Sequence, residues 1–472
     1  MGSAAGQHNY LPVTNPQPAF WGSNADEFHH HRTTPELPEY SDIVVIGAGY
    51  AGAATAWHLA KDRDPSKPRQ SVTVLEARGI CSGATGRNGG HLRPDLYGHT
   101  PTYLERHGPD AAIELAEFEI AHIWAIKEFV EQENIDCDFV LARTVDTWAN
   151  QEAADEATKV YETMKGHSVA YMRDVFFRYG PEAEGLSGVK GAKATASYTS
   201  GMMWPYKFIR HILKSLVASG DLNLQTHCPV TKVVQNADGT FTITTARGTI
   251  RARKAVHASN AYVGGLLPEY SKSIVPCKGI CCRITVPEGK VAPLLSNSYI
   301  ERDANRTLSY LVPRTDGSII VGGASSLFKP HTEQWYNNVD DSVLIDSAKD
   351  YYDGYMQRTF RGWEDSEARV DQIWTGVMGY SYDSHAHIGE VPDRPRQLVI
   401  AGFNGHGMPV IWLSAKGVAK MLNDDVPFEE TKVPRVFKTT KARLEVAQNG
   451  KEEYGDILGD GSLSQKVSNA RP

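Results

Sequence analysis

A strand–turn–helix–strand segment near the beginning of the chain constrains the fold more than any other feature. Residues 43–46 form an apolar run after Asp42, the pattern Gly47-x-Gly49-x-x-Gly52 follows, and a second apolar run ends at Glu76. Gly47 allows a tight turn, Gly49 lets the backbone approach a pyrophosphate, and Gly52 lets a helix pack on the strand. The helix N-terminus offers N–H groups to phosphates, and Glu76 is spaced to reach a ribose. The segment predicts a dinucleotide site, and a glycine-rich turn that binds nothing is the alternative.

Composition places the chain among soluble globular enzymes, with two domains or one elaborated domain expected from its length. Its 472 residues exceed a single small core, and 41% are hydrophobic and 22% charged, as in soluble proteins. The net charge of −7 argues against nucleic-acid and anionic-membrane partners. Six scattered cysteines predict no disulfide framework and a reducing compartment. We recognise no secretory signal or bilayer-length apolar run, so the cytoplasm is the expected location.

Two groups of metal-binding residue types occur, and neither completes a site. Cys277, Cys281 and Cys282 lie close together but lack the second pair or local histidine of a tetrahedral set, so they predict buried strand cysteines. His385 and His387 alternate as if on one face of a strand, without a third ligand in view. No metal is therefore expected.

The apolar patterns predict an α/β fold, α+β overall, in which two domains alternate along the chain. The ranges expected to build the nucleotide-binding domain are 40–110, 200–270 and 365–425. The ranges expected to build an antiparallel-sheet substrate domain are 110–200 and 271–364. Helices are expected over 110–133, 151–166, 206–217, 341–360 and 409–422, and strands over 138–148, 230–236, 241–245, 248–253 and 254–261.

Both ends of the chain read as surface segments. Residues 1–38 are polar and rich in proline, which predicts an extended arm lying on the surface. The histidines at 29–31 predict a solvated patch there, with metal binding as the alternative. Residues 428–472 turn polar and basic, which predicts a tail that wraps the surface.

Three further segments accompany the first glycine motif in a fixed order. They are a glycine-rich stretch at 82–90, a small-residue turn at 258–262, and a C-terminal region from 374 to 408 that closes with a second glycine turn. Together with the first motif, they resemble the D-amino-acid-oxidase-like (DAO) family of FAD-dependent amine oxidoreductases. That family includes sarcosine oxidase, glycine oxidase and γ-glutamylputrescine oxidase, and the 82–90 stretch is most similar to the last of these. The resemblance covers roughly residues 40–425 and implies a Rossmann-like FAD-binding domain with an interleaved substrate domain.

The resemblance also implies which residues bind FAD. The second glycine stretch would lie along the flavin, and the turn at 402–408 would lie by the pyrimidine edge, where a helix N-terminus can stabilise negative charge. The expected cofactor-binding residues are Gly47, Gly49, Tyr50, Ala51, Gly52, Glu76, Ala77, Arg78, Ser82, Gly83, Ala84, Thr85, Gly86, Arg87, Asn88, Gly89, Gly90, His91, Val230, Ser259, Asn260, Gly402, Asn404, Gly405, His406, Gly407 and Met408.

The flavin is expected to be held noncovalently. Sarcosine oxidases attach it to a cysteine just before a tyrosine of the C-terminal segment, and Met378 stands at that place here, before Gly379 and Tyr380. A thioether cannot form there. His91 could instead bond to the flavin 8α carbon, as in dimethylglycine-type relatives, although the local motif differs.

Four residues are the catalytic candidates implied by the resemblance. Lys278 falls where the family runs a strand beneath the flavin, and a cation near N5 would assist oxygen; a lysine at a strand edge is the alternative. His406 lies in the pyrimidine-edge turn, and Tyr310 and Tyr382 could line the substrate pocket, with aromatic core packing as the alternative for Tyr310.

Substrate recognition is the least specified part of the sequence. Glycine and D-amino-acid oxidases clamp a carboxylate with arginine, and residues 380–387 offer none where glycine-oxidase relatives have one. Arg283 and Arg314 are candidates, with surface charge as the alternative. Asp383 matches a family aspartate and could be structural or face the substrate.

The predicted function is oxidation of a C–N bond in an amine or amino-acid-like compound. Hydride would pass to flavin N5, the imine product would be hydrolysed, and oxygen would reoxidise the flavin to give hydrogen peroxide. The expected partners are therefore a small amine and oxygen. The alternatives are an FAD-dependent dehydrogenase that uses another acceptor and a non-catalytic FAD-binding protein.

Overall fold

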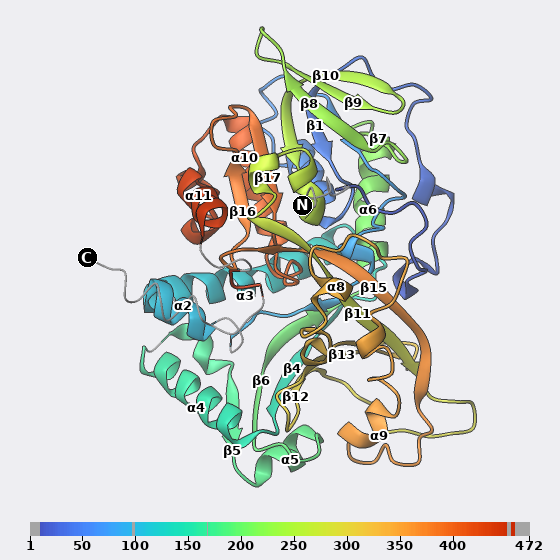
Figure 1. Ribbon diagram of the computed structural model, residues 1–472, viewed down its shortest axis with the longest axis vertical. Helices are drawn as coiled ribbons and strands as arrows, with labels where there is room; N and C mark the ends of the chain where they lie inside the picture. The colour runs from blue at the N-terminus through green and yellow to red at the C-terminus, as the bar shows by residue number, and fades with distance from the viewer. Residues whose placement is uncertain (1–9, 97–99, 168, 451–454, 458–472) are drawn as a thin grey trace, which may run out of the picture.

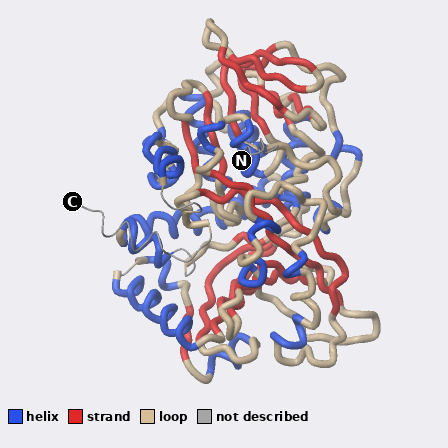
Figure 2. The backbone as a smooth tube through the Cα atoms, in the orientation of Figure 1, coloured by secondary structure: helices blue, strands red, loops and turns tan. Residues whose placement is uncertain are grey.

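Two β-sheets, one in each half of the molecule, organise the chain (Figures 1 and 2). The computed structural model describes residues 10–96, 100–167, 169–450 and 455–457. The expected arm at 1–38 and tail at 428–472 therefore lie partly outside the described residues. The chain enters each sheet more than once, which confirms the predicted α/β architecture of interleaved elements.

The first sheet has eight strands and a parallel centre. Its main order is β16 (His387–Glu390), β17 (Gln397–Ala401), β10 (Gly248–His257), β1 (Tyr40–Ile46), β2 (Val72–Leu75) and β7 (Asn223–Gln225), and β8 (Val230–Gln235) and β9 (Phe241–Thr245) extend it from β10. β1 pairs in parallel with both β2 and β10. Its residues from Val44 to Ile46 are all buried, as a strand covered on both faces requires. The expected strands at 248–253 and 254–261 are one strand, β10.

The second sheet has nine strands and is mainly antiparallel. Its order is β15 (Arg369–Ser381), β11 (Ile274–Thr285), β14 (Ile319–Gly323), β13 (Leu308–Pro313), β12 (Ser298–Arg302), β4 (Val140–Trp148), β6 (Ala194–Met202) and β3 (His91–Leu92), and β5 (Phe176–Tyr179) pairs with β6. β15 therefore pairs here, although residues 365–425 were expected to belong to the nucleotide-binding domain. β11 and β15 are the longest paired strands and run from one half of the molecule to the other (Figure 1).

Helices cover the sheets. They are α1 (Tyr50–Lys61), α2 (Thr100–His107), α3 (Pro109–Gln132), α4 (Gln151–Gly166), α5 (Glu182–Ser187), α6 (Pro205–Ala218), α7 (Ser325–Phe328), α8 (Thr332–Trp335), α9 (Tyr355–Thr359), α10 (Ile411–Asp424) and α11 (Lys441–Asn449). α1 packs closely on α10 because its buried face is mostly alanine. The rings of Trp57, Phe129 and Trp412 meet beside this contact and join α3 to it.

Two local expectations are wrong. Residues 341–360 form turns and the short helix α9 rather than one helix, because Gly354 adopts a left-handed conformation with φ 63° and starts a new element. His385 and His387 do not alternate on one strand, because Ser384 has φ 63° and β16 begins only at His387. Within the described residues, no three histidine, cysteine or acidic side chains come together as metal ligands would.

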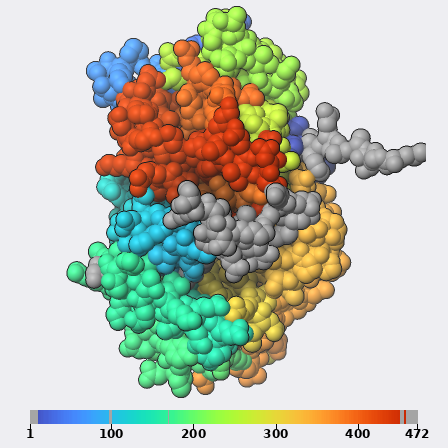
Figure 3. Space-filling view, turned by 60° about the vertical axis from the view of Figure 1, so that its left-hand side comes forward, coloured from blue at the N-terminus to red at the C-terminus, as the bar shows by residue number. Residues whose placement is uncertain are grey.

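Parts of both end segments are buried rather than lying on the surface. In the arm, Phe20, Trp21 and Phe28 join the main hydrophobic core. The Trp21 indole is fully buried and donates to the Asn88 carbonyl oxygen of the second glycine stretch. In the tail, Phe428 and Phe437 are buried against α10 and its surroundings, and the red C-terminal residues form a band across the face shown in Figure 3. Both segments are polar on average, and most of the described residues that are buried in them are apolar. Composition alone therefore did not predict this burial.

None of the described helices has both the length and the apolar character needed to cross a membrane.

We predict that the arm stabilises the fold through Trp21. Replacing Trp21 with alanine removes a fully buried indole and should lower the free energy of unfolding by about 4 kcal/mol. Denaturant unfolding measures this loss. The matched control is Trp124→Ala, whose side chain is 49% exposed and whose removal should change stability little. Equal effects of the two substitutions would contradict the buried role of the arm.

Candidate functional site

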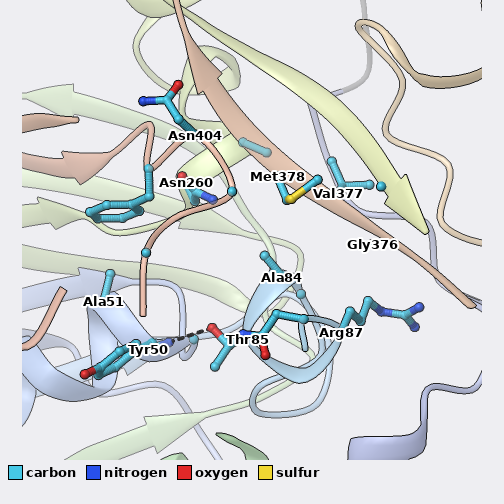
Figure 4. Close-up of a pocket in the computed structure, with 18 of the residues that line it drawn as sticks. Tyr50, Ala51, Ala84, Thr85, Arg87, Asn260, Gly376, Val377, Met378 and Asn404 are labelled. Carbon is cyan, nitrogen blue, oxygen red and sulfur yellow. Dashed lines mark hydrogen bonds between the residues drawn. The ribbon is translucent and has the colours of Figure 1, made fainter. Parts of the chain in front are cut away.

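A cavity of about 830 Å³ lies where the two sheets approach each other. The N-terminus of α1, the loop at 82–91 and the turn at 402–408 border it from the first half of the molecule, and β11, β12, β13 and β15 border it from the second. Figure 4 shows Ala84 and Thr85 on one side of the space and Met378 and Asn260 on the other. Segments distant in sequence therefore meet around one continuous space.

The first glycine turn is shaped by close backbone contacts. Gly47 has φ 111°, and a Cβ there would lie 2.8 Å from the Ala258 carbonyl oxygen. A Cβ on Gly52 would lie 1.8 Å from the Gly47 carbonyl oxygen, so this glycine serves the packing of α1 and does not line the cavity. Gly49 and Ala51 do line it. The first-turn N–H groups of α1 thus border the cavity, where an anion would meet the positive end of the helix dipole.

Glu76 is held in place by the backbone around it. Its Oε2 accepts a hydrogen bond from Ala48 N at 2.8 Å, and its Oε1 accepts one from Arg78 N at 2.9 Å. The carboxylate therefore bridges the glycine turn and the end of β2 while it lines the cavity beside Val230. A carboxylate oxygen can accept more than one hydrogen bond, so the group can still bind ribose hydroxyls.

The loop at 82–91 follows the cavity wall with its backbone. Tyr50 N donates to Thr85 Oγ1 at 3.0 Å, which joins this loop to the start of α1 (Figure 4). A Cβ added to Gly83 would meet no atom within 4 Å, so the backbone there borders open space. The Arg87 guanidinium is occupied by the surrounding backbone. It donates to the carbonyl oxygens of Ser82, Thr375 and Gln17.

The second glycine turn is fixed by two asparagines. Asn260 Oδ1 accepts from Gly402 N at 2.9 Å, and Asn404 Oδ1 accepts from Ser381 N at 2.7 Å. Gly402 and Gly405 have φ near 75° and 73°, which favours glycine. Gly402 packs behind the turn, whereas Asn404 and Gly405 line the cavity just before α10 begins.

Most expected cofactor residues border this cavity. Those that line it are Gly47, Gly49, Tyr50, Ala51, Glu76, Ala77, Arg78, Gly83, Ala84, Thr85, Arg87, Asn88, Gly89, His91, Val230, Ser259, Asn260, Asn404, Gly405, His406, Gly407 and Met408. Those that do not are Gly52, Ser82, Gly86, Gly90 and Gly402. The five support the wall from behind; a Cβ on Gly86, for example, would lie 2.1 Å from the Cys81 carbonyl oxygen.

His406 forms an ion pair with the buried Glu119 of α3. Its Nε2 lies 2.9 Å from Glu119 Oε2, and the glutamate side chain is only 3% exposed. Burial alone would lower the pKa of His406, but the charge and hydrogen bond of Glu119 outweigh it, so the pKa lies above its usual value. When protonated, the ring would add a positive charge to the cavity wall next to the second glycine turn.

The structure brings two of the four catalytic candidates to the cavity. His406 and Tyr310 line it, and the Tyr310 hydroxyl lies 2.7 Å from Cys281 Sγ. Lys278 does not line it, because its side chain leaves the opposite face of β11 and donates to the Val343 carbonyl oxygen at 3.0 Å. Tyr382 packs against Gly450 and Gly455 outside the cavity.

The acidic and basic candidates for substrate contact lie elsewhere. Asp383 is paired with Arg443 through both oxygens, which holds the pKa of its half-buried carboxyl well below the usual range and indicates a structural role. Arg314 pairs with Asp138, and Arg283 pairs with Asp316. None of these residues lines the cavity.

Several residues that line the cavity were not predicted from the sequence. Tyr10, Leu11 and Pro12 reach it from the arm, and nothing in their composition indicates a binding role. Arg93 and Arg302 line its far end. Arg93 could have been found, because it follows His91 by two positions and so shares its side of an extended segment.

The sequence of this chain is similar to those of known proteins. Residues 42–421 match the model of the DAO family, described as FAD dependent oxidoreductase. The chain belongs to this family. It is 24% identical over 410 residues to the probable oxidoreductase OrdL of Haemophilus influenzae, covering 84% of this chain and 88% of that protein. It is 24% identical over 394 residues to the gamma-glutamylputrescine oxidoreductase of Escherichia coli, covering 81% and 84%.

Solved structures share the fold. Glycine oxidase from Geobacillus kaustophilus superposes with a TM-score of 0.65 at 20% identity, over 82% of this chain and 95% of that one. L-Amino acid deaminase from Proteus myxofaciens gives a TM-score of 0.66 at 17% identity, over 90% and 97%. The expected family and cofactor, FAD, are thereby confirmed.

The residues of this DAO-family chain fit FAD. The N-terminus of α1 and Glu76 suit the pyrophosphate and ribose, and the open space in front of Gly83 leaves room beside the 82–91 backbone. Met378, whose side chain cannot form a thioether, lines the cavity. His91 also lines it, with Nε2 at 2.7 Å from Ser298 Oγ, and burial keeps its pKa well below the usual value. Noncovalent attachment stays a prediction.

We predict that Glu119 keeps His406 protonated. In Glu119→Gln the charge is lost while burial remains, so the pKa of His406 should fall below its usual 6.5. A pH titration of the flavin absorbance of the holoprotein should show this transition displaced to lower pH. Glu117→Gln, on the exposed side of α3, is the control and should titrate like the wild type.

The free energy of unfolding should depend on pH through the same pair, His406 and Glu119. Because the folded pKa of His406 is raised, its stabilisation is complete below pH 6.5 and is lost as the pH rises through the folded pKa. The variant should therefore lose most stability, about 2 kcal/mol, on the acidic side of that pKa. A stability difference that grows with pH would contradict this assignment.

Proposed function

We propose that this DAO-family protein is an oxidase of a C–N bond in a small amine or amino-acid-like compound. The observation that carries the proposal is the single cavity that joins the nucleotide-binding turn at Gly49 to the face of the second sheet at Tyr310. A dinucleotide in the first part would present its flavin ring to a compound held in the second. Relatives named gamma-glutamylputrescine oxidoreductase and glycine oxidase support this class of substrate.

The residues of the chain provide binding, orientation and exclusion of water. Ile300, Met378 and Phe403 give the cavity apolar walls, which favour a neutral amine over a hydrated ammonium. The Tyr310 ring lies against Gly89 and Gly322, where a Cβ would lie 2.3 Å and 2.2 Å from tyrosine atoms, so its position is fixed. When bound, FAD supplies the acceptor for a hydride at N5 and returns the electrons to oxygen as hydrogen peroxide. The imine product would hydrolyse in water.

His406 has a charge role in this proposal. Its protonated ring, held by Glu119, lies at the turn that in the family borders the flavin pyrimidine edge. A fixed positive charge there would favour the reduced, anionic form of the ring. Noncovalent attachment is part of the proposal, because Met378 cannot form a thioether.

The first prediction from this function is spectroscopic. Purified protein should show flavin absorbance bands, and acid precipitation should leave the yellow colour in the supernatant. Under anaerobic conditions, one or more small amines should bleach the bands, and oxygen should restore them with release of hydrogen peroxide. Colour in the pellet would overturn noncovalent attachment. Bleaching that oxygen does not reverse would indicate a dehydrogenase, and a flavin that no amine bleaches would refute the proposed function.

The second prediction concerns Lys278. Because its ammonium group bonds to the Val343 carbonyl oxygen and faces away from the cavity, Lys278→Met should leave the rate of reoxidation by oxygen unchanged. It should lower the free energy of unfolding by about 2 kcal/mol, the worth of a charged hydrogen bond. Stopped-flow reoxidation and denaturant unfolding measure the two effects. The control is Lys232→Met on the exposed side of β8, and a large fall in the reoxidation rate for Lys278→Met alone would restore its catalytic role.

A further inference from the structure

The cavity extends beyond the residues that face the loop at 82–91, which we call the flavin loop. In the antiparallel pair of β12 and β13, Ile300 lies opposite Tyr310 and Arg302 lies opposite Leu308, and all four residues line the cavity. Tyr310 packs on Gly89 of the flavin loop. Side chains two positions apart on a strand are about 7 Å apart and share one face. Arg302 therefore lies one such step farther from the flavin loop than Ile300.

Two arginines at this end share one carboxylate. Arg93 Nη2 donates to Asp146 Oδ2 at 2.7 Å, and Arg302 Nη1 lies 3.5 Å from the same oxygen. Asp146 is fully buried on β4 and also accepts from the Tyr198 hydroxyl at 3.2 Å. Asp95 lies 3.8 Å from Arg93 on its other side. Arg93 thus faces two carboxylates, whereas Arg302 faces one that is already satisfied by Arg93.

Both guanidinium groups keep unused donors. Arg93 Nε and Arg302 Nη1 are buried, and neither has a hydrogen-bond partner among the described residues. The Arg302 guanidinium is oriented by the Trp148 ring, whose centroid lies 4.9 Å away. Arg302 Nη1 has only its 3.5 Å ion pair with Asp146, and a buried charged donor without a hydrogen bond is costly. An anionic ligand in the cavity would supply that partner, and a planar carboxylate matches the geometry of guanidinium best.

We propose that Arg302, assisted by Arg93, binds a carboxylate of the substrate that is remote from the C–N bond being oxidised. The inference rests on the proposed function for the identity of the reacting end. Ile300, one strand step before Arg302, and Leu308, directly opposite Arg302, are both apolar, so the link between the two ends is an aliphatic chain. The substrate class is an amine that carries a carboxylate at its far end. Arg302 is a specificity-determining residue in this assignment.

A structural role for Arg302 makes a different prediction. If it served only to neutralise Asp146, Arg93 would still do so at 2.7 Å, and its loss would affect stability without regard to the ligand. A binding role makes the loss specific to carboxylates. The matched control is Arg306, which lies in the loop after β12, is 44% exposed at its side chain and pairs with Glu152 and Glu156.

The binding experiment uses the FAD-loaded protein, with glutarate as the anionic probe and glutaramide as its uncharged counterpart. Calorimetry and the perturbation of the flavin spectrum report binding. The wild type and Arg306→Gln should bind glutarate and not glutaramide, and Arg302→Gln should weaken glutarate binding by about tenfold or more. Arg302→Lys, which keeps the charge, should restore part of it. Equal glutarate binding by the wild type and a folded Arg302→Gln would overturn the proposal, as would no binding by the wild type.

The turnover experiment compares straight-chain ω-aminocarboxylates with alkylamines of the same length. Arg302→Gln should raise KM about tenfold or more for the carboxylated series alone, and leave kcat nearly unchanged. Equal KM changes for both series would overturn the proposal. If no amine of either series bleaches the flavin in the wild type, the proposed function fails, while the glutarate measurement still decides whether the carboxylate site exists.

Discussion

The buried carboxylate of Asp341 is the interaction on which the arrangement around the cavity depends. It accepts both hydrogen bonds of the Arg78 fork, at 3.0 and 3.1 Å, and lies 3.3 Å from Arg87 Nε. Arg78 follows the end of β2, and Arg87 belongs to the loop that borders the cavity. Removing a single partner from such a buried group leaves an uncompensated charge, so the loss of any one of the three would be strongly destabilising. Gln17 of the arm also donates its backbone N–H to the Asp341 carbonyl oxygen.

This cluster explains why the cavity has a fixed wall although it is built from distant segments. Once both arginines are anchored, Arg87 can donate to the carbonyl oxygens of Thr375 on β15 and Gln17 on the arm. The flavin loop is thus fixed to the second sheet on one side and to the arm on the other. The two long strands β11 and β15 then extend the same wall toward the substrate end. The nucleotide end and the far end of the cavity thus share one continuous wall.

Much of the nucleotide end could be predicted from sequence because its determinants are local. The turn at Gly47, the helix that begins after Gly49 and the strand that ends at Glu76 follow each other within one βαβ unit, so spacing alone defines their geometry. Lys278 shows where such reasoning fails. Its place on a strand was correct, but the face of the strand to which its side chain points depends on the register with β15 and on the loop at Val343. A shift of one position reverses that face.

The sequence by itself determined the family, the cofactor and the glycine turn at 47–52, because these depend on backbone conformations that only certain residues adopt at short range. The tertiary structure alone decided that Trp21 of the arm is core, that His406 is paired with Glu119, and that Arg93 and Arg302 share Asp146. Those contacts join residues that are far apart in the chain, and no local pattern encodes which of many buried polar groups will meet. Pairing of the strands brings them within hydrogen-bond distance, and burial makes each contact strong.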